Sequence, residues 1–296
     1  MLSEAREGRR EMGPWVAACL AAVAYPVLTP AVGRVRYLYV ERDKFGRRSG
    51  GVGICEALVW PGKGERHLSG VMGIPRTMTL LYPNMKVEVR EEGGRVVREA
   101  FEAACLCVHQ LLRELKICDD FLHTHDVYLH FGEISVPKEG PSAGLAMAVA
   151  IFSAAVKAPV RGDVAVTGEI TPRGALIRIL GVPYKVEAAL RAGIRTVILP
   201  AGNAKDVLSL PWRLKASVQI IAAPDVKVAL MYALGPNGPL GGEFKRLAGE
   251  RERAVALARQ GRLSEAAAAF RAFSKKAPWD LSIPVWLEYL GMLGAR

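Results

Sequence analysis

The sequence lacks a phosphate-binding loop. No Gly-x-x-x-x-Gly-Lys-[Ser/Thr] pattern occurs in its 296 residues. The closest approach, Gly62-Lys63-Gly64, has neither the hydroxyl residue nor the upstream glycine that cradle a nucleotide phosphate. This absence excludes a P-loop ATPase within these residues, and we expect no cofactor.

Paired cysteines are also missing. The number of cysteines is odd and no Cys-x-x-Cys spacing occurs, which argues against a disulfide framework and a zinc site. Cys105 and Cys107 are two positions apart and cannot share one helix face, so buried thiols are the default interpretation. His123, His125 and His130 have no carboxylates at ligand spacing, and we expect no metal. The five cysteines are Cys19, Cys55, Cys105, Cys107 and Cys118.

Dense basic runs with interleaved aromatic residues are absent, although the formal net charge is +11. The positive charge is spread along the chain, which favours a solvated basic surface over a specific nucleic-acid site. Nonspecific binding to nucleic acid stays an open alternative.

Charge is missing altogether from Pro14 to Gly33, about the length of a membrane span. Arg9 and Arg10 before this stretch also suit a signal anchor or signal peptide. The stretch is rich in alanine, however, and Pro26 and Pro30 interrupt its last third. We favour a buried helix and a cytoplasmic protein, with membrane anchoring through residues 14–33 as the alternative.

The most informative stretch present is Pro137-Lys138-Glu139-Gly140-Pro141-Ser142-Ala143-Gly144, which runs into an apolar segment from Leu145 to Val156. Gly140-Pro141 signals a turn, and proline is favoured where a helix begins. Ser142 then falls in the first helical turn, where backbone N–H groups lack partners within the helix. Such a serine is either a helix cap, the usual role of a lone serine there, or a nucleophile.

A nucleophilic serine needs a base within hydrogen-bonding reach, and no Ser-His-Asp motif is evident. Lysine can serve only if burial disfavours its ammonium form. Lys185 opens a second apolar helical pattern after Gly181, so an inward-facing amine is plausible. The alternative is a surface lysine near a helix N-terminus, where its charge would be mildly unfavourable.

Several motifs in order carry a resemblance to a known family. Pro-Lys-Glu-Gly-Pro-Ser-Ala-Gly is followed by Thr-Gly-Glu-Ile-Thr-x-Arg-Gly, by Gly-x-x-x-Lys and by the stretch from Val197 to Asn203. This series resembles the proteolytic domain of the Lon protease family, from about residue 30 to about residue 235. The resemblance implies that Ser142 is the catalytic serine and Lys185, forty-three residues later, its catalytic lysine.

The same resemblance implies supporting roles and shows departures. Thr167 matches the threonine that orients the lysine amine, and His130 matches a family histidine in the strand before the serine loop. Glu139 stands where the family usually has aspartate. Leu180 replaces the first of two family glycines. Tyr128 replaces a second common histidine, and Pro183 and Tyr184 replace polar residues before the lysine.

The function that the resemblance implies is ATP-independent hydrolysis of peptide bonds in unfolded or small protein substrates, because the family's ATPase module is not found here. The family also implies a homo-oligomer, a hexameric ring, and a separate ATPase partner would be needed for driven unfolding. The alternative is a catalytically silent Lon-like scaffold that oligomerises or recruits partners, as in recombination-associated ATPases.

Hydrophobic patterns predict an α/β domain with a small all-α appendage, and the resemblance implies that this domain is of Lon type. Residues 1–33 form a polar start and the apolar segment, and 34–235 the protease domain. Within that domain, residues 74–93 suggest an inserted hairpin, and Val164 to Ile170 a buried strand. Residues 236–242 form a Gly/Pro linker, and 243–296 a helical tail with one tetratricopeptide-like pair or a plain helical hairpin.

Overall fold

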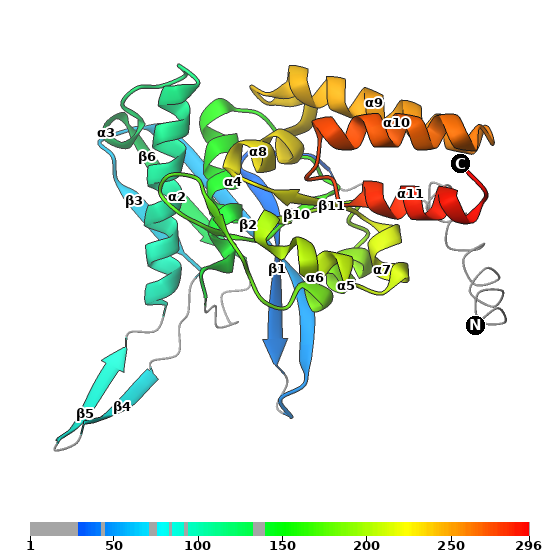
Figure 1. Ribbon diagram of the computed structural model, residues 1–296. Helices are drawn as coiled ribbons and strands as arrows, with labels where there is room; N and C mark the ends of the chain where they lie inside the picture. The colour runs from blue at the N-terminus through cyan, green and yellow to red at the C-terminus, as the bar shows by residue number, and fades with distance from the viewer. Residues whose placement is uncertain are drawn as a thin grey trace.

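A seven-stranded sheet forms the centre of the protein (Figure 1). In this computed structural model the described residues are 29–42, 45–70, 76–82, 85–91, 94–132 and 140–295. The strand order is β11-β10-β7-β1-β2-β6-β3. Its strands are β1 (Arg34–Arg42), β2 (Arg48–Pro61), β3 (Arg66–Ser69), β6 (His125–Phe131), β7 (Val164–Val166), β10 (Thr196–Pro200) and β11 (Gln219–Ala223).

The sheet is mixed. Strands β11, β10, β7 and β1 pair in parallel, as do β6 and β3, whereas β2 pairs antiparallel with both β1 and β6. The parallel part is covered on both faces, so its inner strands are rich in apolar residues, and all residues of β7 and all five of β10 are buried. This arrangement confirms the predicted α/β class.

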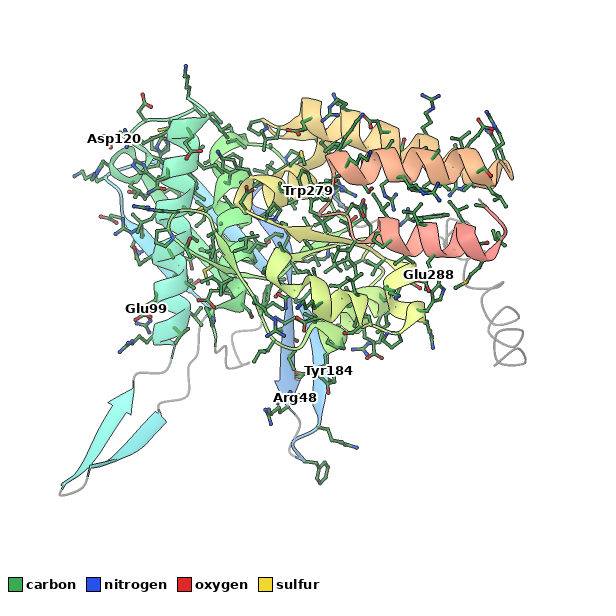
Figure 2. All side chains as sticks on the ribbon, in the orientation of Figure 1. Arg48, Glu99, Asp120, Tyr184, Trp279 and Glu288 are labelled. Carbon is green, nitrogen blue, oxygen red and sulfur yellow. The ribbon has the colours of Figure 1, made fainter. Side chains whose placement is uncertain are left out.

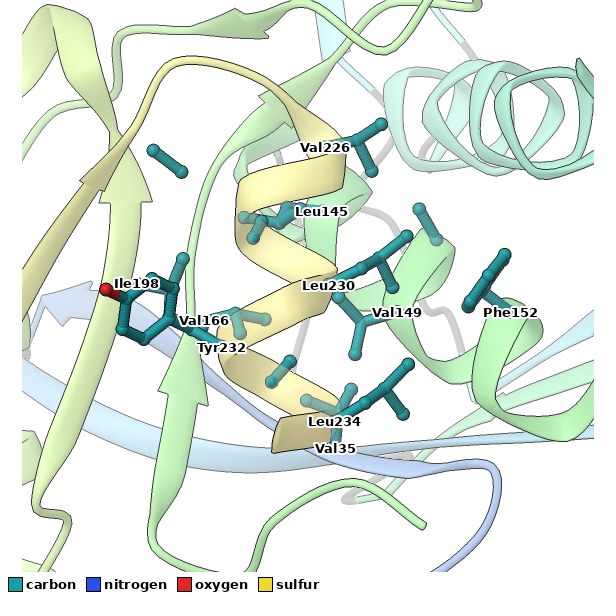
Figure 3. Packing of buried hydrophobic residues seen from close by; sticks show 14 of the residues in the cluster. Val35, Leu145, Val149, Phe152, Val166, Ile198, Val226, Leu230, Tyr232 and Leu234 are labelled. Atoms are coloured by element: carbon teal, nitrogen blue, oxygen red, sulfur yellow. The ribbon is translucent and has the colours of Figure 1, made fainter. Parts of the chain in front are cut away.

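One face of the sheet is covered by α2 (Arg95–Glu114), α4 (Gly144–Val156) and α8 (Val226–Leu234). Helix α4 is central, because every residue from Gly144 to Ser153 is buried, as its lack of charged side chains requires. Figure 3 shows Leu230 and Leu234 of α8 beside Val149 of α4 in this core.

The opposite face is covered by α5 (Val182–Arg191), α6 (Ala204–Leu208) and α7 (Trp212–Ser217). A second apolar cluster lies beneath them and includes Leu38 of β1 and Val186 of α5. The short helix α3 (Phe121–Thr124) precedes β6. The two helical layers therefore hold the beginnings of α4 and α5 on opposite faces of one rigid sheet.

Two small hairpins stand apart from the central sheet. The predicted hairpin within residues 74–93 is confirmed, since β4 (Arg76–Tyr82) and β5 (Met85–Glu91) pair antiparallel. The second hairpin joins β8 (Glu169–Ile170) to β9 (Leu176–Ile177). It corrects the prediction of one strand from Val164 to Ile170, because the chain leaves the central sheet after Val166 and turns toward the serine loop.

The helical tail packs on the protease domain. It comprises α9 (Gly241–Arg259), α10 (Leu263–Lys276) and α11 (Ser282–Met292), and residues 235–240 include the short 3-10 helix η3 (Gly235–Asn237). Phe244 packs edge-on against Tyr232 of α8. The segment between α10 and α11 pairs with β11, because Ala222 N donates to Trp279 O and Leu281 N donates to Ile220 O. The tail thus covers the outer edge of the sheet.

The burial of Cys105 and Cys107 agrees with the expectation of buried thiols. Cys55, Cys105 and Cys107 are buried, and burial raises the pKa of the Cys105 and Cys107 thiols to about 12. Among the described residues, no three His, Cys, Asp or Glu side chains lie close enough to hold a metal ion. No helix in the described ranges has both the length and the apolarity to cross a membrane. Residues 14–28 of the uncharged segment and Glu139 lie outside the described residues.

Candidate active site

Ser142 lies at the entrance to the buried helix. It is the middle residue of the 3-10 turn η1 (Pro141–Ala143), directly before α4, and it is half-buried. Gly144 begins α4 where only glycine fits, because an added Cβ would lie 2.9 Å from Ile170 Cγ2. Helix α4 has no side-chain cap and no acidic residue in its first turn. The positive end of its dipole is therefore available at Ser142.

Backbone hydrogen bonds join the serine turn to the segment after β7. Gly168 N donates to Ser142 O over 2.8 Å, and Leu145 N donates to Gly168 O over 2.9 Å. Thr167 N donates to Ile198 O in β10 over 2.9 Å. The Thr167 bond still goes to β10, whereas both backbone groups of Gly168 bond to the serine turn and the start of α4, which explains why the chain leaves the sheet here.

Lys185 reaches the same place from the other face of the sheet. It lies in the second turn of α5, and its side chain is buried, with only 3% of the residue exposed. Its Nζ donates to Thr167 Oγ1 over 2.8 Å, and the Thr167 hydroxyl donates to Ser142 O over 3.4 Å. A continuous chain of polar contacts therefore joins the lysine amine, the Thr167 hydroxyl and the serine backbone.

The environment of Lys185 favours the neutral amine. Burial lowers the pKa of Lys185 from 10.5 to about 8. None of the ion pairs between described residues involves this amine, and a hydroxyl is its hydrogen-bond partner. An amine with a pKa near 8 is substantially deprotonated at mildly alkaline pH and can then accept a proton.

The segment that leads into α5 is fixed by Asn203, a residue that the sequence analysis quoted only as part of a motif. Asn203 Oδ1 accepts from Ile179 N over 3.0 Å, and Asn203 Nδ2 donates to Ile179 O over 2.8 Å. Asn203 is completely buried. A polar residue after a buried strand was the available signal, but its partner, 24 residues away, could not be read from the sequence.

His130, another expected site residue, has its partner elsewhere in the described structure. His130 Nδ1 lies 2.8 Å from Ser69 Oγ on the neighbouring strand, and the residue opposite His130 on β2 is Glu56. Glu139 lies outside the described residues. The structure therefore brings together Ser142, Thr167 and Lys185, and it gives His130 a different partner.

The site thus consists of a serine at the head of a buried helix, joined through Thr167 to a buried lysine, in an α/β domain. The model of the Lon protease (S16) C-terminal proteolytic domain matches residues 32–235. The chain belongs to this family.

Relatives agree with this assignment. The Lon protease of Geobacter metallireducens is 37% identical over 178 residues, which are 58% of this chain and 22% of that protein. That of Chloroflexus aurantiacus is 37% identical over 210 residues, covering 70% and 24% of the two chains. That of Xanthomonas oryzae pv. oryzae is 36% identical over 201 residues, covering 67% and 23%. The chain thus spans about a quarter or less of the length of these relatives.

Proposed function

We propose that this chain hydrolyses peptide bonds with a Ser142–Lys185 dyad. The observation that carries the proposal is the buried Lys185 amine, which has a lowered pKa and contacts the serine turn through Thr167. A surface lysine would keep its proton at neutral pH and could not act as a base. Among the alternatives weighed from the sequence, this burial supports the enzyme over the silent scaffold.

The proposed reaction uses the amine twice. Neutral Lys185 takes the proton of the Ser142 hydroxyl as its oxygen attacks the substrate carbonyl carbon, and the resulting ammonium then protonates the departing amine. The scissile C–N bond breaks and Ser142 carries the acyl group. A water molecule, deprotonated by the same amine, releases the acid and regenerates the serine.

Helix α4 supplies the electrostatic part of this mechanism. Negative charge develops on the substrate carbonyl oxygen as the tetrahedral intermediate forms, and helix N-termini stabilise such charge. The first turn of α4 lacks an acidic side chain that would compete for the same positive field. We therefore assign stabilisation of the oxyanion to the backbone N–H groups around Ser142.

The test is cleavage of unfolded casein by the full chain and by two serine variants. Ser142→Ala should remove nearly all hydrolysis while keeping the fold, because it deletes the nucleophile. Ser69→Ala is the matched control, since Ser69 contacts a histidine but lies outside the proposed dyad. Wild-type rates in Ser142→Ala would refute the proposal, and loss of activity in Ser69→Ala alone would assign the nucleophile to Ser69.

We further propose that hydrolysis by this chain needs no ATP, because its 296 residues contain no phosphate loop. The same casein assay with and without ATP should give equal rates. Stimulation by ATP in the purified chain would contradict this, whereas stimulation only after addition of an ATPase would support a separate motor.

We propose unfolded proteins or peptides as substrates and a homo-oligomer as the assembled state, as membership of the Lon family suggests. Sedimentation of the purified chain would measure the oligomer. A monomer that retains full peptidase activity would contradict a required ring.

A further inference from the structure

Leu180 is the most exposed large apolar side chain among the described residues, with 78% of its surface accessible. A single exposed leucine is ordinary in a loop that is free to move. This one lies in the short segment between β9 and α5, which leads to Lys185. The surroundings of Leu180 determine whether its exposed side chain could bind a ligand.

The backbone is fixed on both sides of Leu180. On one side, the buried Asn203 binds both backbone polar groups of Ile179. On the other side, Gly181 adopts a left-handed conformation with φ of 76° and packs so closely that an added Cβ would lie 2.6 Å from Val40 Cγ2. The leucine is therefore presented on a rigid support, which lowers the entropy lost when a ligand binds it.

Leu180 also lies at the helix start that carries the proposed base. Gly181 is the N-cap of α5, so Leu180 precedes the cap by one residue, and Lys185 is the fourth residue of the helix. Residues at these two positions are neighbours in many helices, where they pack against each other as a hydrophobic staple. Because Leu180 is 78% exposed, most of its surface remains free for another contact.

A second exposed apolar residue lies three positions before Leu180 in the sequence. Ile177 in β9 is also exposed, and it lies opposite Glu169, the residue that follows Gly168. The charge between the two apolar residues is neutralised, because Arg178 donates from Nη2 to Asp206 Oδ1 over 2.8 Å and from Nε to Asp206 Oδ2 over 3.2 Å.

We propose that Leu180 is a specificity-determining residue, which contacts, with Ile177, an apolar side chain of an extended substrate segment beside the bond to be cut. This inference rests on the proposed peptidase function. The resemblance to the family implies a glycine at the position of Leu180, so this contact would be particular to this chain. The occupant is an unfolded polypeptide, the substrate class of the proposed function, because the hairpin that carries Ile177 borders the serine turn: Ile177 lies opposite Glu169, and the preceding residue, Gly168, donates to Ser142 O over 2.8 Å.

The test begins with mapping a cleavage position in casein by mass spectrometry. Synthetic peptides spanning that position then carry Leu or Ser at the residue on either side of the cut. For wild type we expect kcat/KM to favour Leu about tenfold on one side, the order expected for one apolar side chain in a matching contact. Leu180→Ala should reduce this ratio below about threefold, and Leu180→Met should retain it, because Met keeps an apolar side chain of similar volume.

Leu293→Ala is the matched control, since Leu293 is an exposed leucine in the tail, with 49% of its surface accessible, and should leave the ratio unchanged. An unchanged ratio in Leu180→Ala, with wild-type cleavage of both peptides, overturns this inference and leaves the peptidase function standing. No cleavage by wild type removes both. A change of oligomeric state in Leu180→Ala, with the ratio kept, assigns Leu180 to a subunit contact and also overturns the proposal.

Discussion

Lys185 and Asp280 are the two charged residues that are almost completely buried in the described part of the chain, and their surroundings differ. Asp280, at the junction of the tail with β11, accepts from Gln219 Nε2, Ser282 N and Ser282 Oγ, and Arg251 Nε lies 3.3 Å from its Oδ2. Lys185 has one hydroxyl partner, Thr167, and no carboxylate partner in the described structure.

This difference distinguishes a buried charge that stabilises the fold from one that can take part in proton transfer. A buried charge with a counterion and several hydrogen bonds is compensated. Removing one member of the ion pair leaves the remaining charge buried without compensation, which is destabilising. A buried charge with little compensation shifts its pKa and becomes available for proton transfer. Asp280 should therefore matter for stability, and Lys185 for catalysis.

The largest expected effect is the loss of activity in Lys185→Met. Removing the base should reduce kcat/KM on a short peptide by about 10³-fold or more, since general base and nucleophile act as one unit. The fold should be at least as stable at pH 7, because the substitution removes a buried amine that lacks a counterion. Peptidase kinetics and denaturant unfolding measure the two quantities.

Lys185→Arg is the sharper control. It keeps the positive charge but cannot lose its proton in a protein, so it should be about as inactive as Lys185→Met. Appreciable activity in Lys185→Arg would show that the amine is not the base. The contrast between a catalytic Lys185 and a structural Asp280 would then not hold.

Asp280→Ala should show the reverse pattern. It leaves the partly buried Arg251 without its carboxylate and removes three accepted hydrogen bonds, so we expect a loss of about 3 kcal/mol in the free energy of unfolding. Peptidase activity well below the unfolding temperature should stay near that of wild type. Denaturant unfolding followed by circular dichroism measures the loss.

The matched control is Glu265→Ala, which removes an exposed carboxylate paired with Arg262 in the same tail. Exposed ion pairs contribute little, so its effect should remain below about 1 kcal/mol. Equal stability of the Asp280→Ala and Glu265→Ala variants would show that burial does not distinguish the two carboxylates.

Activity should depend on pH through Lys185. With a pKa of about 8, the fraction of neutral amine, and with it the rate, should rise about tenfold per pH unit below pH 7 and level off above about pH 9. A pH-rate profile on a short peptide records this. A profile that is flat between pH 6 and 8 would contradict a base with this pKa.

Stability should carry the same signature with a defined sign. The pKa of Lys185 is lower in the folded state, about 8, than the ordinary lysine value of 10.5, so between these values the unfolded chain binds more protons. Stability from this group therefore rises with pH across that window. The difference between wild type and Lys185→Met isolates this slope from the buried thiols, which act in the opposite direction.

The sequence was sufficient for the parts of the protein that depend on local pattern. The resemblance to the Lon family, carried by an ordered motif series, located both proposed catalytic residues, Ser142 and Lys185. The β4–β5 hairpin followed from two short runs around a turn, and the uninterrupted apolar run after Gly144 predicted a buried helix. The hairpin and the helix are each contained in a short segment, where periodicity and turn residues carry the information.

The parts that the sequence could not provide depend on residues far apart in the chain. Asn203 fixes Ile179 across 24 residues, and Gln219 meets Asp280 across 61. The strand expected from Val164 to Ile170 ends early because Gly168 bonds to the serine turn, a contact that only the folded chain creates. A run of strand-forming residues does not reveal at which residue the backbone stops bonding to the sheet and bonds to a loop instead.

The smallest expected effect comes from Thr167→Val, which removes the hydrogen-bond partner that Lys185 has among the described residues, while keeping the shape of a completely buried side chain. The hydroxyl accepts from Nζ and also donates to Ser142 O, so it orients the base relative to the serine without taking part in proton transfer. The plateau rate should fall about tenfold, less than in Lys185→Met, because orientation is impaired and the base remains. Losing an acceptor disfavours the ammonium form further, so the midpoint of the pH-rate profile should move below about 8.

Thr167→Ser keeps the hydroxyl and should preserve both the rate and the midpoint. If Thr167 had only a structural role, Thr167→Val would lower activity in proportion to stability and leave the midpoint in place. An unshifted midpoint in Thr167→Val would therefore show that the Thr167 hydroxyl does not influence the pKa of the lysine amine.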